Sequence, residues 1–227
     1  MKWHFDDFIY GSIDGAVTTF AIVAGVVGAS LSPGIIIILG FANLFADGFS
    51  MAAANYQAAK ARNEFVQMKR RQEEWEIDNL EEQERDEIRE IYREKGFKDE
   101  LLEDVVRIIT SRRKVWIDTM MKEELGLIDD EKNPLESSVS TFVGFNLIGL
   151  IPLLPFMIFL MMGIESNSDA FIYSTIFVLA AFFLVGMFKG KIVRHSMLRS
   201  GIITLIIGGL AAGVAYIVGY GLNFLIS

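Results

Sequence analysis

Apolar positions dominate both ends of the chain, and charged positions are concentrated in its middle. Residues 60–137 hold 16 of the 21 Lys/Arg and 23 of the 29 Asp/Glu, whereas both flanks are nearly free of charge. Apolar runs of about 20 residues are typical of helices that cross a hydrocarbon core of ~30 Å. The pattern therefore predicts an integral membrane protein with one large polar insert.

Five membrane helices are predicted from the apolar segments and from the Gly and Pro positions that separate them. They cover roughly residues 9–30, 34–59, 138–163, 170–188 and 201–224, and the third is interrupted near Pro152 and Pro155. Neither Gly nor Pro occurs between Phe49 and Lys95, so the second helix is expected to continue out of the membrane to about Asp78.

The insert is predicted to be a three-helix domain. Its first helix continues the second membrane helix, and its other two helices cover about 80–95 and about 99–125, with a break near Ser111. Gly96 and Gly126 end these two helices, as Gly commonly does. The predicted fold is an all-α integral membrane protein with membrane segments at 1–59 and 131–227 and a helical domain at 60–130.

The distribution of basic residues predicts the orientation in the membrane. All 21 Lys/Arg fall near the N-terminus, in the insert or between residues 189 and 199, and the other loops have none. Because cytosolic loops are enriched in Lys and Arg, we expect a cytosolic N-terminus and insert and an external C-terminus. The chain shows no pattern of a targeting segment, so we expect a prokaryotic plasma membrane.

Composition excludes several classes of function. The chain has no Cys, and its two His residues, His4 and His195, are too few for a multi-His catalytic metal centre. A net charge of −8 argues against nucleic-acid binding. The chain also lacks a nucleophile–base pair and a phosphate-binding Gly loop, so we expect neither an enzyme nor a prosthetic group.

Two acids lie within predicted membrane helices. Asp14 is in the first helix, and Asp47 lies about 13 residues into the second. A carboxylate in the bilayer costs roughly 2.5–3.5 kcal/mol and usually faces an interior path, although Asp14 could also simply cap its helix near the interface. Asn43, Asp47 and Met51 form one stripe at four-residue spacing. The stripe predicts a cation path in which carboxylates exchange protons for the ion.

The insert carries a second group of candidate ligands. Glu73 and Glu76 are three residues apart, as are Glu84 and Glu87, so each pair shares a helix face. On the last helix of the insert the matching candidates are Met120, Met121 and Glu124. Carboxylates suit Ca²⁺, Mg²⁺ or Mn²⁺, and added thioether sulfur favours a softer ion such as Fe²⁺. The alternative is a solvated, salt-bridged surface, which is the usual role of Glu-rich helices with interleaved Arg.

Small residues form a third signal. Gly11 and Gly15 in the first helix, and Gly209 and Gly213 in the fifth, have the four-residue spacing of close helix contacts. This spacing is compatible with a homodimer.

Four stretches resemble the vacuolar iron transporter family. They are SIDGAVTTF at 12–20, followed by Gly25; ADGFSM at 46–51; YQAAK at 56–60; and WIDTMMKEELG at 116–126. The resemblance covers essentially the whole chain, including the five spans and the insert.

The resemblance implies a homodimeric transporter that moves Fe²⁺ out of the cytosol in exchange for protons, along a path between the two subunits. It places transport residues at Asp14 and Met51. It places cytosolic metal ligands at Glu73, Glu76, Glu84, Glu87, Met120, Met121 and Glu124. Mn²⁺, Co²⁺ and Zn²⁺ are further ions for these ligands, and iron homeostasis is the implied role. Plant members have a second acid where this chain has Asn43, and Asp47, one turn away, is the candidate to replace it.

Two other functions fit the same residues. One is a Mn²⁺ transporter of the same architecture, because both ions accept carboxylate ligands. The other is a membrane-anchored metal buffer or sensor without transport, although a plain anchor needs neither Asp14 nor Asp47.

Overall fold

The structure is a computed structural model that describes residues 4–127, 132–164 and 166–226. All regular elements in these ranges are helices. Five of the described helices are long and apolar enough to cross a membrane, which confirms the predicted number of spans. The chain forms two compact units: an apolar unit of Met1–Gln57 and Pro134–Ser227, and a charged unit of Ala58–Asn133. The predicted domain boundary at residues 130 and 131 lies outside the described residues.

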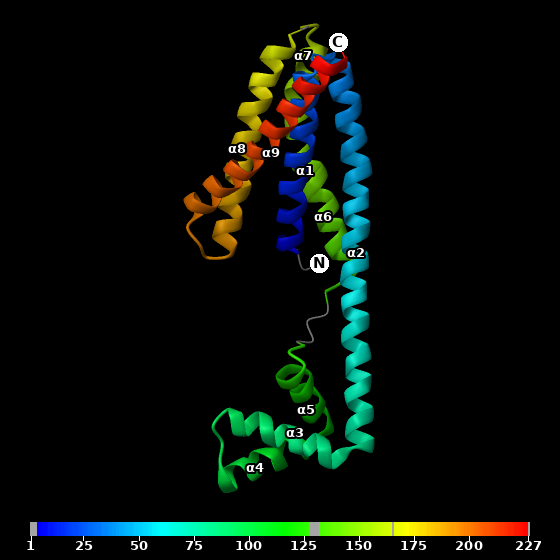
Figure 1. Cartoon of the computed structure of the whole chain (residues 1–227), viewed down its shortest axis with the longest axis vertical. Coiled ribbons are helices and arrows are strands. Elements are labelled where there is room, and N and C mark those ends of the chain that lie inside the picture. The colour runs from blue at the N-terminus through cyan, green and yellow to red at the C-terminus, as the bar shows by residue number, and fades with distance from the viewer. Residues whose placement is uncertain (1–3, 128–131, 165, 227) are drawn as a thin grey trace. The chain divides into compact units, whose positions relative to one another are not determined.

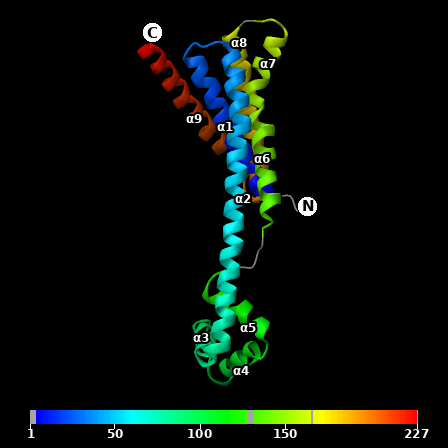
Figure 2. The same ribbon diagram turned by 90° about the vertical axis from the view of Figure 1, so that its right-hand side faces the viewer.

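The apolar unit is built around its first helix, α1 (Phe5–Gly28). Figures 1 and 2 show α1 flanked by the first part of α2 (Pro33–Asn79), by α6 (Pro134–Gly149) and by the hairpin of α8 (Asn167–Ile192) and α9 (Met197–Ile226). Between α6 and α8 lie a short 3₁₀ turn, Ile151–Leu153, and α7 (Leu154–Met161). The turn contains Pro152 and interrupts the third span where the sequence predicts it.

Glycine allows α1 and α6 to approach closely. A Cβ atom at Gly15 would lie 2.3 Å from the carbonyl oxygen of Phe145, so no larger residue fits there without moving a helix. Gly11 meets the backbone of Thr141 in the same way. The Gly11–Gly15 spacing therefore serves packing within the chain, whereas a Cβ at Gly209 or Gly213 would have no atom within 4 Å.

The second helix, α2, is too long to lie wholly in a bilayer. Its 47 residues extend for about 70 Å, more than twice the hydrocarbon thickness. Its apolar part ends near Ala59, and Lys60, Arg62 and Glu64 follow at once. The membrane-crossing part of α2 is therefore its N-terminal half, and the α2 residues from Lys60 to Asn79 lie outside the bilayer.

The charged unit consists of the second half of α2, α3 (Glu81–Glu94), α4 (Asp99–Thr110), α5 (Arg113–Thr119) and a π-helical turn, Met120–Glu124. The break between α4 and α5 includes Ser111. Its core contains Ile88, Val106, Trp116 and Met120, all at most 3% exposed. Val66 and Ile77 of α2 belong to the same core, which therefore packs α2, α3, α4 and α5 against one another.

Candidate metal sites

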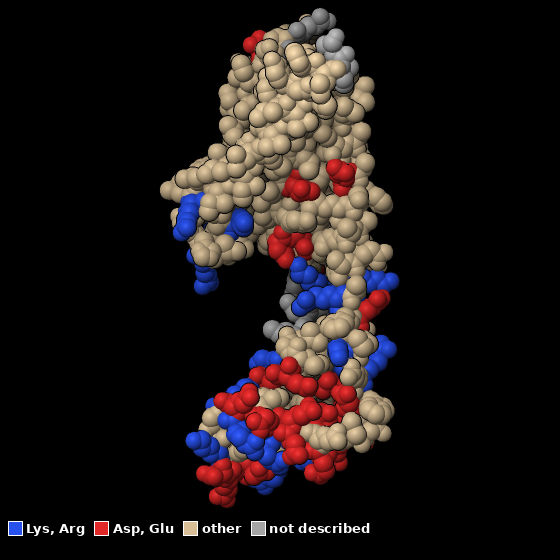
Figure 3. Space-filling model, viewed as in Figure 1, with Lys and Arg blue, Asp and Glu red and all other residues tan. Residues whose placement is uncertain are grey.

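Five glutamates of the charged unit form an acidic cluster. Glu73 and Glu76 come from α2, Glu84 and Glu87 from α3, and Glu124 from the π-helical turn. The cluster is held together by apolar neighbours, because Glu73 and Glu84 each lie one turn before a buried isoleucine, Ile77 and Ile88. Figure 3 shows acidic side chains crowded over this unit.

Two members of the acidic cluster are buried without hydrogen-bond partners. Glu73 is 2% exposed and Glu84 is 4% exposed. In each residue Oε2 is buried and has no partner among the described residues. Since buried polar atoms are normally paired, two orphaned carboxylate oxygens in one cluster indicate a position that a bound cation would fill.

The proton affinities of the cluster are shifted upward. Burial, reinforced by the charges of Glu124, Glu76 and Glu87, raises the pKa of Glu73 to about 7. Burial and the same kind of repulsion, chiefly from Glu87, raise the pKa of Glu84 to about 8. The pKa values of Glu87 and Glu124 are also raised, first by burial and then by neighbouring glutamates. Without a cation, the cluster therefore holds protons at neutral pH.

Two methionines are buried on the same turn as Glu124. Met120 is fully buried and Met121 is 2% exposed, and both belong to the core of the charged unit. Leu125 N–H donates to the Met120 carbonyl at 3.2 Å, which makes this a π turn rather than an α turn. Single π turns inside helices are frequent at functional sites. The methionines provide soft thioether sulfurs beside hard carboxylates.

A second set of polar residues follows the contact between α1 and α2. The α2 residues are spaced four apart, which puts them on one face. We call this set the polar seam; it comprises Asp7, Asp14, Thr18 and Thr19 of α1 and Asn43, Asp47, Met51 and Asn55 of α2.

Hydrogen bonds across the polar seam join the two helices at two levels. The Asn43 amide nitrogen lies 3.4 and 3.3 Å from the hydroxyl oxygens of Thr18 and Thr19. At the other level, the Asn55 amide donates to the Asp7 carboxylate. Asp14 and Asp47 lie between these levels along their helices, and like charges on the two carboxylates repel each other.

The predicted path residues differ in burial. Asp14 is half-buried, and Met51 is partly buried against the core of the apolar unit. Asn43 is also partly buried, whereas Asp47 is exposed on the surface of this unit. One of the two intramembrane acids is therefore left uncovered by the chain itself.

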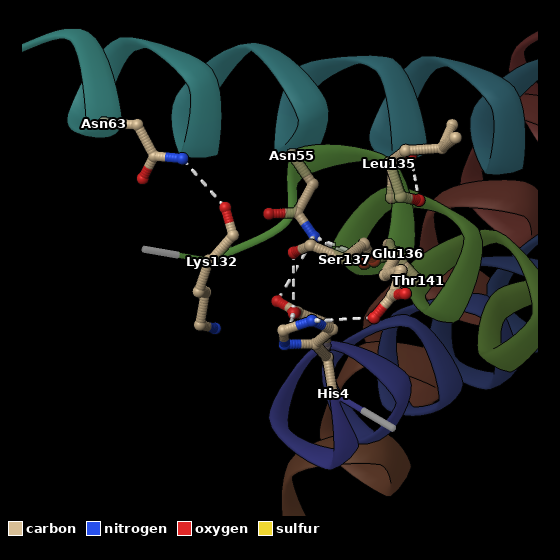
Figure 4. A network of polar contacts seen from close by, with 10 residues as sticks. His4, Asn55, Asn63, Lys132, Leu135, Glu136, Ser137 and Thr141 are labelled. Atoms are coloured by element: carbon tan, nitrogen blue, oxygen red, sulfur yellow. Dashed lines mark hydrogen bonds and ion pairs between the residues drawn. The ribbon is translucent and has the colours of Figure 1, made fainter. Parts of the chain in front are cut away.

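The Asp7 end of the seam is a network of hydrogen bonds that the sequence did not predict. The Asn55 amide donates to the Thr141 hydroxyl at 2.6 Å and to the Asp7 carboxylate at 3.2 Å, and the Ser137 hydroxyl donates to Asp7 at 2.6 Å (Figure 4). Four-residue spacing contains a signal for one of these residues, because Asn55 lies four residues after Met51 and extends the stripe of Asn43, Asp47 and Met51. Asp7 lies seven residues, or about two helical turns, before Asp14.

His4 extends this network to the N-terminus of α6. Its imidazole nitrogens lie 3.8 Å from a carboxylate oxygen of Asp7 and 3.8 Å from one of Glu136. Among the described residues, the only three carboxylate or imidazole groups with ligand atoms within 4.8 Å of one another are His4, Asp6 and Asp7. The carboxylates of the acidic cluster are spread more widely, so a cation there would draw them together.

Comparison with known proteins adds an independent line of evidence. The model of the VIT family matches residues 5–220. The Vacuolar iron transporter of Toxoplasma gondii is 38% identical over 216 residues, which is 93% of this chain and 72% of that protein. The Vacuolar iron transporter of Plasmodium falciparum is 33% identical, covering 93% of this chain and 79% of that protein. Vacuolar iron transporter 1 of Arabidopsis thaliana is 34% identical, covering 92% of this chain and 82% of that protein.

Proposed function

The chain belongs to the VIT family of integral membrane proteins, and we propose from this that it exports Fe²⁺ from the cytosol in exchange for protons. The observation that carries the proposal is the acidic cluster with its two orphaned, buried carboxylate oxygens. The names of the relatives support iron as the ion, and the polar seam supports passage across the membrane.

The charged unit captures the ion. Glu73, Glu76, Glu84, Glu87 and Glu124 supply oxygen ligands, and Met120 and Met121 bias the choice toward Fe²⁺. Because Glu73 and Glu84 have pKa values of about 7 and about 8, a cation displaces protons when it binds at neutral pH. Mn²⁺, Co²⁺ and Zn²⁺ compete for the same ligands.

The polar seam carries the ion through the bilayer. Asp14 and Met51 act as ligands, and Asp47 and Asn43 lie on the same side of the path. A proton that arrives from outside neutralises a carboxylate and releases the ion, so the acids serve both as ligands and as proton carriers.

A second copy of the chain completes the path. Asp47 is exposed on the apolar unit, and leaving a carboxylate against lipid costs roughly 2.5–3.5 kcal/mol. The large side chains Phe45 and Phe49 beside it are 62% and 70% exposed. A homodimer that packs this part of α2 against its partner removes both the carboxylate and the aromatic rings from lipid.

The orientation that we propose rests on the charges at the two ends of the apolar unit. The rings of Phe5 and Phe188 are in edge contact, so the start of α1 and the basic α8–α9 turn lie at the same end. We assign this end to the cytosol by the positive-inside rule, together with the charged unit. The C-terminus is then outside. A prokaryotic plasma membrane stays a prediction, since the relatives named above are eukaryotic.

Ion flux into proteoliposomes tests the proposal. Wild type should transport Fe²⁺ only when the side that receives the ion is acidic, and Asp14→Asn should reduce flux to background while leaving metal binding by the acidic cluster intact. Asp169→Asn is the matched control, because Asp169 is an exposed acid in the first turn of α8, outside the seam.

Two results would overturn it. Transport by Asp14→Asn at the wild-type rate would show that the polar seam is not part of the transport path. Metal binding without flux in any variant would leave a membrane-anchored metal-binding protein. Competition between Fe²⁺ and Mn²⁺ in the same assay identifies the preferred ion.

A further inference from the structure

A cavity of about 710 Å³ opens between α1 and the α8–α9 hairpin of the apolar unit. Figure 1 shows this hairpin diverging from α1 toward its turn. Ile13 lines the cavity from α1, Lys189 from α8, and Arg199, Ile203 and Ile207 from α9. The volume is within the range of small-molecule binding sites. The polar seam and the acidic cluster do not use these α8 and α9 residues.

The cavity has a cationic end and an apolar end. Arg199, Ile203 and Ile207 follow one another at four-residue steps on α9 and all line it. The distance along the helix from Arg199 to Ile207 is about 12 Å. The cavity therefore changes from basic at the end of the membrane span to apolar two turns deeper, which matches the polarity of a phospholipid.

The basic side chains at this end lack acidic partners. Lys189, Lys191, Arg194 and Arg199 make no side-chain hydrogen bond or ion pair within the described part of the chain. In the charged unit, by contrast, arginines such as Arg85, Arg89 and Arg107 pair with nearby acids. Figure 3 shows this basic group at the end of the apolar unit.

The first turn of α9 adds to the attraction for an anion. Ser196 precedes the helix and lines the cavity, and its hydroxyl accepts a hydrogen bond from Arg199 N–H. The helix that begins here is 30 residues long, so the positive end of its dipole lies beside the cavity. Cations, a helix N-terminus and an apolar wall thus meet in one cavity.

We propose that this cavity binds one anionic phospholipid. The lipid phosphate lies between Lys189, Arg199 and the start of α9, and an acyl chain follows Ile203 and Ile207 toward Ile13. The site recognises the headgroup by its negative charge. A zwitterionic lipid, whose net charge is zero, therefore binds more weakly. The proposal is independent of transport and of the metal sites.

Native mass spectrometry of the full chain in detergent tests the site. Dioleoyl phosphatidylglycerol should bind more tightly than dioleoyl phosphatidylcholine by about thirtyfold, the ratio expected for two cations near the headgroup. Lys189→Gln combined with Arg199→Gln should abolish this preference. The matched control combines Lys191→Gln with Arg194→Gln, which removes the same charge from the same turn but from side chains that do not line the cavity, and it should keep the preference.

A third variant tests the contribution of the apolar end of the cavity to lipid binding separately from that of the basic side chains. Ile203→Trp fills the apolar end without changing any charge and should weaken phosphatidylglycerol binding, while an unchanged melting temperature shows that the protein is folded. If both double variants lost the preference for phosphatidylglycerol equally, the basic turn would attract anionic lipid only through its total charge, and the proposed site would be wrong. Equal binding of the two lipids would also overturn it. Competition by millimolar inorganic phosphate would show that the site takes a soluble anion instead.

Discussion

Metal binding by the acidic cluster should depend steeply on pH. With pKa values of about 7 and about 8, Glu73 is about half protonated and Glu84 about nine-tenths protonated at pH 7. A cation that needs both carboxylates ionised then releases about 1.4 protons as it binds. If the two acids titrate independently, the apparent affinity at pH 6 is about fiftyfold weaker than at pH 7, and at pH 8 it is about tenfold tighter.

Isothermal titration calorimetry with Mn²⁺ measures both the change in affinity with pH and the number of protons released on binding. Mn²⁺ is stable in air and accepts the same carboxylate ligands. Titrations of the full chain at pH 6, 7 and 8 give the change in affinity. Repeating them at pH 7 in buffers with different ionisation enthalpies gives the number of protons released.

Substitution of one acid isolates its contribution. Glu84→Gln removes the group with the higher pKa, so the loss of affinity between pH 7 and pH 6 should shrink to about fivefold, the value for Glu73 alone. Glu82→Gln is the control, because Glu82 is an exposed glutamate on the same helix and should leave the pH dependence unchanged. An affinity that is equal at pH 6 and pH 7, or an unchanged slope in Glu84→Gln, would refute the reasoning.

Two further predictions concern packing and ion choice. Gly15→Ala should lower the melting temperature, because its Cβ would lie 2.3 Å from the Phe145 carbonyl oxygen and such overpacking costs about 1–3 kcal/mol. Gly209→Ala, where no atom lies within 4 Å, should leave the melting temperature unchanged or raise it. Replacing Met120 and Met121 together by Leu keeps the core volume but removes both sulfurs. Calorimetry should then show severalfold weaker Zn²⁺ binding and nearly unchanged Mn²⁺ binding.

The spans were predictable because the bilayer imposes a local rule on sequence. A helix that crosses it needs about 20 apolar residues, and Gly or Pro marks where each helix can end. Pro152 shows this directly, since the third span is interrupted there. Helix pairing follows no such local rule. The spacing of Gly11 and Gly15 predicts a close contact, but only the structure identifies α6 as the partner.

The hydrogen-bond partners of Asp7 were not predictable for a related reason. Its partners, Asn55 and Ser137, lie 48 and 130 residues away in sequence, so no window of the chain brings them together. The sequence around Asp7 indicates only an acid in the first turn of a helix, which is a common and favourable position. Its burial depends entirely on the packing of α1 against α2 and α6.

Four of the five members of the acidic cluster differ from many other acids of the charged unit in having no basic residue three or four positions away, whereas Glu73 has Lys69 and Arg70 there. Many acids there have a basic residue three or four positions away and pair with it, as Glu81 does with Arg85 and Asp104 with Arg107. Glu84, like Glu76, Glu87 and Glu124, has no Lys or Arg at those positions. A carboxylate without a basic neighbour must be solvated, protonated or bound to a cation. Since Glu84 is 4% exposed, solvation is excluded, and the remaining two states are the pair that a proton-coupled metal carrier alternates between.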